Sequence, residues 1–263
     1  MSDVYTMGID IGSTASKCVI MKNGKDIVSS AIVGLGAGTS GTEKVKAETL
    51  SKVDFEESDI AVQVSTGYGR NNYMEAEKTM SELSCHAKGG HFIFGDVRTI
   101  IDIGGQDIKV LKLNQKGQLQ NFLMNDKCAA GTGRFLDVMA KVLDVDIEDM
   151  GKMDAAATET TPISSTCTVF AESEVISCLS KKIPINNIVR GIHASVASRV
   201  SSLAKRGGLE KPVAMTGGVS RNPGIVRALE ESLGTDIQIS DLSQLAGAIG
   251  AALFAYDEYQ KKH

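Results

Sequence analysis

The fold is decided by Ile9-Asp10-Ile11-Gly12-Ser13-Thr14-Ala15-Ser16-Lys17, which is repeated 92 residues later as Ile101-Asp102-Ile103-Gly104-Gly105-Gln106-Asp107-Ile108-Lys109. The two copies agree at both isoleucines, the aspartate, the glycine and the lysine. An offset of this size is far too long for a solenoid repeat and is typical of a duplicated domain. The sequence therefore predicts two similar lobes, each built around one copy of the Asp-Ile-Gly turn.

The residues around each copy repeat as well. One β-rich run precedes each turn and another follows it, and these runs are Val4–Asp10, Lys17–Met21, Thr99–Ile103 and Ile108–Leu113. A polar turn then leads to a third run. The first of these turns, Lys22-Asn23-Gly24-Lys25, contains the Asn-Gly pair that is typical of tight hairpins, and its counterpart is Asn114-Gln115-Lys116-Gly117. Each half is therefore predicted to begin with a three-stranded antiparallel meander.

Helices and further strands are predicted for the rest of the chain from apolar periodicity and capping residues. The expected helices are Thr42–Lys52, Ser81–Lys88, Gly133–Leu143, Ala171–Ser180, Asn187–Lys205, Gly224–Ser232 and Gln244–Lys261. The expected strands between them are Ala61–Ser65, Pro212–Thr216 and Asp236–Ile239. This alternation of strands and helices predicts an α/β fold.

Length and charge exclude several classes of protein. The chain has 263 residues, enough for a sizeable core without disulfide bonds. Its net charge is −4 with acids and bases mixed, so the basic stripe of a nucleic-acid-binding protein is missing. No leader-like apolar run opens the chain, and the longest apolar stretch, near Ala246–Ala255, has about half the length of a bilayer span. We expect a soluble, cytoplasmic protein with neither nucleic-acid nor membrane partners.

The small residues of the first turn have the composition of a phosphate-binding loop. Between Gly12 and Ser16 the backbone N–H groups can approach an anion closely, with the hydroxyls of Ser13 and Thr14 and the amine of Lys17 nearby. Asp10 and Asp102 end corresponding strands, so two facing lobes would bring two carboxylates to a hydrated Mg²⁺ on the phosphates. An Asp-Ile-Gly segment can also simply end a strand, but its duplication favours the functional interpretation.

Two more small-residue segments follow. Gly217-Gly218 lies between an expected strand and an expected helix, where adjacent glycines permit close approach of a ring or a ribose, although such a pair is often only a turn. The helical stretch Leu245–Leu253 carries Ala and Gly on nearly every face. Another helix could approach it closely, and an ordinary buried helix is an equal alternative.

In this order, the segments resemble the actin-like ATPase superfamily of sugar kinases, heat-shock chaperones and actin. The resemblance implies two ribonuclease-H-like lobes with a nucleotide cleft between them. The first lobe would comprise residues 1–95 plus about 246–263, and the second would comprise residues 96–245. It implies that ATP or ADP binds with Mg²⁺, which Asp10 and Asp102 would hold through water. The implied nucleotide residues are Gly12, Ser13, Thr14, Ala15, Ser16, Lys17, Gly104, Gly105 and Gln106 around the phosphates, and Gly217, Gly218 and Gln244 beside the adenosine. Gln106 would contact the γ-phosphate or the attacking water.

Five cysteines without a C-x-x-C pair argue against a secreted disulfide framework. Cys128 follows Lys127 in a small-residue loop before an expected helix, and Cys167 lies among hydroxyl residues before another. A helix N-terminus favours the thiolate, which a soft metal or an iron–sulfur centre requires. Cys18 and Cys178 lie in apolar contexts typical of packing. Cys85 precedes His86 and could suggest a Cys-His pair, but neighbouring residues of a helix point apart, so packing is favoured there as well. Two thiolates per chain cannot complete a four-coordinate cluster, so spacing alone leaves their role open.

The two cysteine loops, together with Thr66-Gly67-Tyr68-Gly69-Arg70 and Glu82-Leu83-Ser84-Cys85-His86-Ala87, resemble the 2-hydroxyacyl-CoA dehydratase activators from Met7 to about Tyr256. The resemblance implies a homodimer with one [4Fe–4S] cluster on its two-fold axis, ligated by Cys128 and Cys167 of each subunit. Ferredoxin or flavodoxin would reduce the cluster. One electron would then pass, with ATP hydrolysis, to a 2-hydroxyacyl-CoA dehydratase that removes water from a (R)-2-hydroxyacyl-CoA.

Three alternatives stay open at this point. The ATPase subunit of an aromatic acyl-CoA reductase shares these motifs. A small-molecule kinase of the same superfamily would need a catalytic aspartate and a sugar-binding insertion, and only Asp107 could be considered for the first. A filament- or chaperone-like nucleotide switch would leave the two cysteine loops unexplained.

Overall fold

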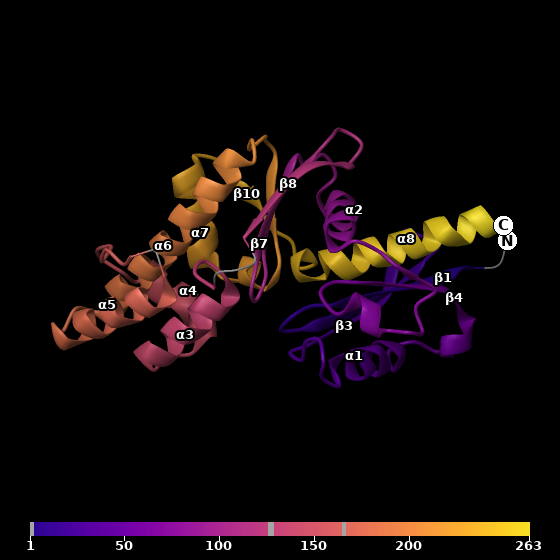
Figure 1. Ribbon diagram of the computed structural model, residues 1–263, viewed down its shortest axis with the longest axis horizontal. Coiled ribbons are helices and arrows are strands. Elements are labelled where there is room, and N and C mark those ends of the chain that lie inside the picture. The colour runs from indigo at the N-terminus through magenta and orange to yellow at the C-terminus, as the bar shows by residue number, and fades with distance from the viewer. Residues whose placement is uncertain (1–2, 126–128, 165–166) are drawn as a thin grey trace. The chain divides into compact units, whose positions relative to one another are not determined.

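The computed structural model describes residues 3–125, 129–164 and 167–263 (Figure 1). The chain divides into two compact units, each with its own sheet. Unit 1 comprises Met1–Val97, Leu113–Leu119 and Ser240–His263, and unit 2 comprises Arg98–Lys112 and Gln120–Ile239. Among the described residues no helix is both long and apolar enough to cross a membrane.

Unit 1 contains a five-stranded sheet in the order β3-β2-β1-β4-β5. Its strands are β1 (Tyr5–Ile11), β2 (Ser16–Lys22), β3 (Asp26–Val33), β4 (Ile60–Thr66) and β5 (Lys78–Thr79). Its helices are α1 (Gly41–Leu50), α2 (Glu82–Phe94) and α8 (Ala246–Lys262), with 3₁₀ turns at Glu57–Asp59, Arg70–Asn72 and Ser243–Leu245. β2 is antiparallel to β1 and to β3, which confirms the predicted meander, whereas β4 is parallel to β1.

Both faces of the unit 1 sheet are buried, so its strands read as nearly continuous apolar runs. Ile9 and Ile20 pack with Val45 of α1. The alternate residues of β2 point the other way, and Val19 packs with Ile249 of α8. Figure 1 shows α1 and α8 on opposite sides of this sheet. The two-residue period of the strands thus supplies one apolar row to each helical layer.

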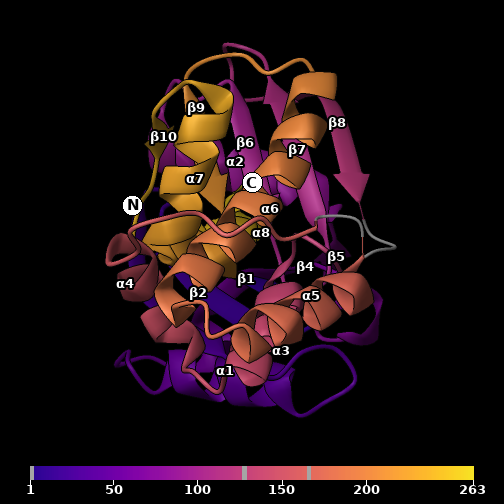
Figure 2. The ribbon, with the colours of Figure 1, turned by 90° about the vertical axis from the view of Figure 1, so that its left-hand side faces the viewer.

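Unit 2 contains a second five-stranded sheet in the order β10-β9-β6-β7-β8. Its strands are β6 (Thr99–Ile103), β7 (Ile108–Leu113), β8 (Leu119–Asn125), β9 (Val213–Thr216) and β10 (Ile237–Gln238). Its helices are α3 (Gly133–Leu143), α4 (Met150–Ala155), α5 (Thr168–Ser180), α6 (Ile185–Arg206) and α7 (Pro223–Leu233), with 3₁₀ turns at Ile147–Asp149 and Gly218–Arg221. α6 packs against α4 and α7, and α3 packs against α5 (Figure 2).

The duplication also includes the parallel strand beside each aspartate, β4 in unit 1 and β9 in unit 2, for which the sequence shows no repeated motif. In both sheets the aspartate lies opposite the lysine of the neighbouring antiparallel strand and opposite a threonine of the parallel strand. These sets are Asp10, Lys17 and Thr66 in unit 1, and Asp102, Lys109 and Thr216 in unit 2. Each threonine is followed by a glycine with positive φ, Gly67 or Gly217.

The element bounds differ from the predictions mainly at helix ends. α2 continues to Phe94 rather than ending at Lys88, and α5 begins at Thr168 rather than Ala171. α4 was not predicted, because six residues are too few for a clear helical period. α7 begins at Pro223, where the Asn222 side chain accepts hydrogen bonds from the first-turn N–H groups.

Small residues let α2 and α8 approach each other closely, which is one of the two interpretations that the Ala/Gly pattern of α8 left open. A methyl group added at Gly89 of α2 would lie 1.9 Å from Ala246 O, and one added at Gly250 of α8 would lie 1.9 Å from Cys85 O. Backbone atoms cannot move aside as a flexible side chain would. The distance between these two helices therefore depends on glycine at both positions.

Replacing Gly250 with alanine is expected to lower the free energy of unfolding by about 1–3 kcal/mol, because the methyl group would force α2 and α8 apart. Gly34→Ala is the matched control, because nothing lies within 4 Å of the added methyl group there. Urea unfolding of both variants measures the difference. Equal midpoints for the two variants would contradict the close packing of these helices.

Candidate functional site

Asp10 is a buried carboxylate at the carboxyl end of β1, and it is 2% exposed. Its Oδ2 lies 3.1 Å from the Nζ of Lys17, which donates a hydrogen bond to it. Its Oδ1 is also buried and accepts no hydrogen bond from the described residues. Buried carboxylate oxygens normally have polar partners. Oδ1 therefore keeps its capacity to accept hydrogen bonds, which suits a water molecule or a hydrated cation.

Glycine brings the backbone close to this carboxylate. Gly67 follows β4 with a φ of 88°, and a methyl group there would lie 2.4 Å from Asp10 Oδ1. On the other side, a methyl group at Gly12 would lie 3.2 Å from the Nζ of Lys17. Larger residues at either position would displace the aspartate or the lysine.

The turn between β1 and β2 is held by its own backbone and by the segment after β3. Gly12 N donates to Ala15 O at 3.0 Å, and Ala37 N donates to Gly12 O at 2.9 Å. The hydroxyl of Ser16 donates to Leu35 O, so this side chain supports the turn. By contrast, no hydrogen bond from the N–H of Ser13 or Thr14 to another described residue is seen. Such a turn offers backbone donors to an anion.

The second copy is more completely paired. Asp102 is 2% exposed; its Oδ1 accepts a hydrogen bond from Thr216 Oγ1 at 2.8 Å, and its Oδ2 lies 3.3 Å from the Nζ of Lys109. Lys109 is 1% exposed and also lies 2.8 Å from Asp107 Oδ2. A buried ammonium needs such carboxylate partners to offset its loss of hydration.

The two aspartates therefore differ in spite of their matching sequence. Thr66 occupies in unit 1 the register position that Thr216 occupies in unit 2. Its hydroxyl, however, donates to Met80 O at 3.1 Å instead of to the aspartate. Asp102 is held by the fold at both oxygens, whereas Asp10 is held at Oδ2.

The second glycine turn repeats the geometry of the first. Gly104 N donates to Asp107 O at 3.0 Å, as Gly12 N does to Ala15 O. The carbonyls of Gly104 and Gly105 accept from Gly133 and Arg134, so the first turn of α3 supports this turn. The Gln106 side chain is exposed at the tip of the turn.

The remaining predicted nucleotide residues lie in different units. Gly217 has a φ of 84°, and a methyl group there would lie 2.3 Å from Ile103 O and 3.0 Å from Asp102 Oδ1. Gly218 begins the 3₁₀ turn after it. These two glycines belong to unit 2, whereas Gln244 is partly buried in a 3₁₀ turn of unit 1.

The cysteines separate by burial. Cys18 and Cys85 are fully buried, and burial raises the pKa of each thiol to about 12, which confirms their assignment to packing. Cys178 is half-buried and packs against the unit 2 core. Cys167 is partly exposed and forms the N-cap of α5. Cys128 lies outside the described residues.

Unit 2 also contains a buried ionic cluster that the sequence did not reveal. Asp154 of α4 and His193 of α6 are both fully buried, with Asp154 Oδ2 2.6 Å from His193 Nδ1. Arg227 of α7 donates to both carboxylate oxygens at 3.0 Å. Burial by itself would raise the pKa of Asp154, but the hydrogen bonds from His193 and Arg227 outweigh it and lower the pKa. This cluster joins three helices.

Replacing Asp154 with alanine is expected to lower the free energy of unfolding by about 3–5 kcal/mol at neutral pH, because His193 and Arg227 would lose their carboxylate. Since the pKa of Asp154 is lowered in the folded protein, its ionised carboxylate contributes to the free energy of unfolding at pH values above the ordinary aspartate pKa. This contribution is lost as the pH falls through the lowered value.

The matched control for this change is Asp149→Ala, because Asp149 is an exposed residue that pairs with exposed Lys152. We expect a change within about 0.5 kcal/mol there. Thermal unfolding from neutral to acidic pH measures both variants. Similar losses in the two would contradict the role of the cluster.

Comparison with known proteins places these features in a family. Residues 7–255 match the profile of the BadF/BadG/BcrA/BcrD ATPase family. The chain is 59% identical to the 2-hydroxyisocaproyl-CoA dehydratase activator of Clostridioides difficile, over 97% of this chain and 96% of that protein. It is 55% identical to the (R)-2-hydroxyglutaryl-CoA dehydratase activating ATPase of Acidaminococcus fermentans, over 98% and 99% of the two chains.

A solved structure agrees with this similarity. The activator of the 2-hydroxyisocaproyl-CoA dehydratase from Clostridium difficile, with bound ADPNP, superimposes with a TM-score of 0.96 at 58% identity. The match covers 98% of this chain and 97% of that one. The predicted α/β class is thus confirmed by the two mixed sheets and by a relative of the same fold.

Proposed function

Because the chain belongs to the BadF/BadG/BcrA/BcrD ATPase family, we propose that it is an ATP-dependent activator of a 2-hydroxyacyl-CoA dehydratase. The observation that carries this proposal is the 59% identity to such an activator over nearly the full length of both proteins. The duplicated Asp-Lys pairs and glycine turns support it, because they supply the parts that an ATPase needs. ATP would be hydrolysed to ADP and free phosphate.

We assign the nucleotide to the two glycine turns. Backbone N–H groups from Gly12 to Ser16, and those of Gly104 and Gly105, would donate to phosphate oxygens, and Lys17 would neutralise part of their charge. The exposed side chain of Gln106 would orient the γ-phosphate or the attacking water. Gly217, Gly218 and Gln244 would contact the nucleoside.

Mg²⁺ fits the aspartate of unit 1. It prefers oxygen ligands and keeps several of its own waters. Asp10 Oδ1 is a buried carboxylate oxygen with hydrogen-bonding capacity left, so it can accept from a metal-bound water. Asp102 would assist through its charge, since both of its oxygens already accept hydrogen bonds within the fold.

A [4Fe–4S] cluster fits Cys167, the partly exposed N-cap of α5. Cys167 combines partial exposure with a helix N-terminus, where a thiolate is favoured. Within the described residues no three His, Cys, Asp or Glu side chains gather into a metal site. We propose that Cys128 and Cys167 of two copies hold the cluster in a homodimer, since each chain would then supply two of the four thiolates. When bound, it supplies one-electron redox chemistry at low potential.

The activator would work between two other proteins in the cytoplasm. Ferredoxin or flavodoxin would deliver the electron, and the partner dehydratase would receive it and remove water from a (R)-2-hydroxyacyl-CoA. The role of ATP hydrolysis would be conformational, because loss of the γ-phosphate changes the contacts that two glycine turns make. The small-molecule kinase is disfavoured by Asp107, the one residue considered as its base, because Asp107 pairs with buried Lys109 at 2.8 Å.

Anaerobic purification followed by iron analysis and activity measurements tests the proposal. We expect a brown protein with about four irons per dimer that releases free phosphate from MgATP. With a chemical reductant it should activate a purified 2-hydroxyacyl-CoA dehydratase. Iron-free protein after strict anaerobic reconstitution would contradict the cluster, and a phosphorylated metabolite would identify a kinase instead.

A further inference from the structure

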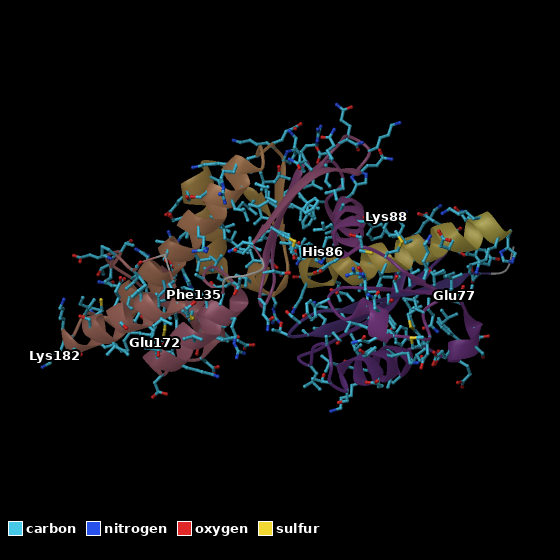
Figure 3. The ribbon with its side chains drawn as sticks, in the orientation of Figure 1. Glu77, His86, Lys88, Phe135, Glu172 and Lys182 are labelled. Atoms are coloured by element: carbon cyan, nitrogen blue, oxygen red, sulfur yellow. The ribbon has the colours of Figure 1, made fainter. Side chains whose placement is uncertain are left out.

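His86 is a buried side chain of α2 to which the proposed function gives no role. It is 6% exposed and lies where α2 packs on the start of α8 (Figure 3). A methyl group added at Gly247 of α8 would lie 3.0 Å from His86 Nε2 and 2.9 Å from Asp10 Oδ2. The imidazole and the carboxylate therefore converge on the same backbone position of α8, close enough for one water molecule to bridge them.

The close packing of α2 on α8 determines this approach. Gly89 and Gly250 bring the two helix backbones together on either side of the Gly247 contact. A side chain at position 247 would occupy the space between His86 and Asp10. The glycine thus serves the same purpose as Gly67 on the other side of the aspartate, where a methyl group would lie 2.4 Å from Oδ1.

The polar surroundings of Asp10 support a role for His86. Oδ2 already accepts from Lys17 at 3.1 Å. His86 Nε2 lies 4.0 Å from Oε1 of Glu82, one helical turn earlier, whose side chain is 23% exposed. A polar path therefore runs from the buried carboxylate past the imidazole to a side chain that reaches the protein surface.

The carboxylate of Asp102 in unit 2 has one more hydrogen-bond donor than the carboxylate of Asp10. Asp102 is oriented by two donors, Thr216 and Lys109. Asp10 has the matching lysine, but the hydroxyl of Thr66 is directed to Met80 O. Among the described residues, Oδ1 of Asp10 therefore lacks the donor that Thr216 gives to Asp102. The imidazole of His86 is a polar group on a rigid helix at the place where a second constraint could act.

We propose that His86 is a positioning residue for Asp10. It constrains Oδ2 through a bridging water, so that Oδ1 faces the hydrated Mg²⁺ of the bound nucleotide. This inference rests on the proposed function, because it takes a magnesium nucleotide as the ligand. It predicts that His86 affects the contribution of Mg²⁺ to nucleotide affinity more than the affinity for the metal-free nucleotide.

Isothermal titration of the full-length protein with ADP, in Mg²⁺ and in EDTA, tests the inference. Two substitutions of similar size separate hydrogen bonding from packing: His86→Leu has no donor, whereas His86→Gln keeps one. We expect His86→Leu to weaken MgADP binding by about tenfold, with metal-free ADP changed by less than about twofold. His86→Gln should recover most of the lost affinity, since its amide can donate to the same water.

His91→Gln is the matched control, because it makes the same change one and a half turns further along α2, where the ring packs against Gly117. It should bind MgADP as the wild type does. The inference is overturned if His86→Leu keeps the full effect of Mg²⁺, or if it weakens ADP equally with and without the metal. Should His86→Leu fail to fold, His86→Met replaces it with the same expectation.

Binding data for the wild type and for His86→Leu separate the nucleotide site from the role of His86. A wild-type protein that binds no ADP, or whose ADP affinity does not respond to Mg²⁺, would remove the proposed nucleotide site and the role of His86 with it. A wild-type protein that responds to Mg²⁺, together with a His86→Leu variant that responds equally, would remove the role of His86 alone.

Discussion

Replacing Cys167 with alanine is expected to strip the protein of its iron while nucleotide binding persists. Cys167 is the partly exposed N-cap of α5, and its side chain makes no capping hydrogen bond. The substitution would therefore remove the proposed cluster ligand and leave the helix in place. If two copies share the cluster, the substitution removes one thiolate from each copy, which is half of the four ligands. We expect iron to fall from about four per dimer to nearly none after anaerobic reconstitution.

Cys178→Ala is the matched control, because Cys178 belongs to the same helix but packs against the unit 2 core. It should keep its iron and its visible absorbance. ADP binding, measured by titration, should match the wild type in both variants. A Cys167→Ala protein with full iron content would contradict the ligand assignment, as would loss of iron from Cys178→Ala.

Replacing Asp10 with asparagine is expected to slow ATP hydrolysis by about a hundredfold to a thousandfold. The amide has nearly the same size, so the packing against Gly67 is kept. What disappears is the negative charge that pairs with Lys17 and that would accept hydrogen bonds from metal-bound water. Phosphate release from MgATP measures the effect, and circular dichroism shows whether the variant is folded.

Asp102→Asn provides the internal comparison, because it makes the same change in the second copy. Here the larger effect should be on stability, since the 1% exposed Lys109 would lose the charge of Asp102, one of the two carboxylates that it contacts. We therefore expect a lower unfolding midpoint for Asp102→Asn than for Asp10→Asn. Wild-type hydrolysis by Asp10→Asn would contradict the assignment of this carboxylate to the magnesium nucleotide.

Much of the fold could be predicted because its signals are local. The repeat around Asp10 and Asp102 predicted strands β1, β2, β6 and β7, and the Asn-Gly turn predicted the hairpin that joins β2 to β3. Burial of Cys18 followed from its apolar neighbours in β2. These features depend on residues close together in the chain, where side-chain alternation and turn chemistry determine the backbone.

Features that depend on distant segments were missed. Asp154 and His193 lie 39 residues apart, and Arg227 lies 73 residues beyond Asp154, so no motif connects the three. The packing of His86 beside Asp10 needs Gly247, which comes from the last helix of the chain. The adjacent Cys85 and His86 suggested a pair in the sequence, but the thiol is buried against α8 and the imidazole approaches the aspartate.

By itself, the sequence determined that this chain carries two copies of an Asp-Lys turn, because the two residues of each pair are only seven positions apart, on adjacent antiparallel strands. The tertiary structure decided that the two copies are not equivalent. The threonine beside each Asp-Lys pair comes from a more distant part of the chain. Thr216, 114 residues from Asp102, donates a hydrogen bond to that aspartate, whereas Thr66 donates to Met80 O. Local sequence specifies a turn, but the partners of a buried charge depend on which distant elements pack around it.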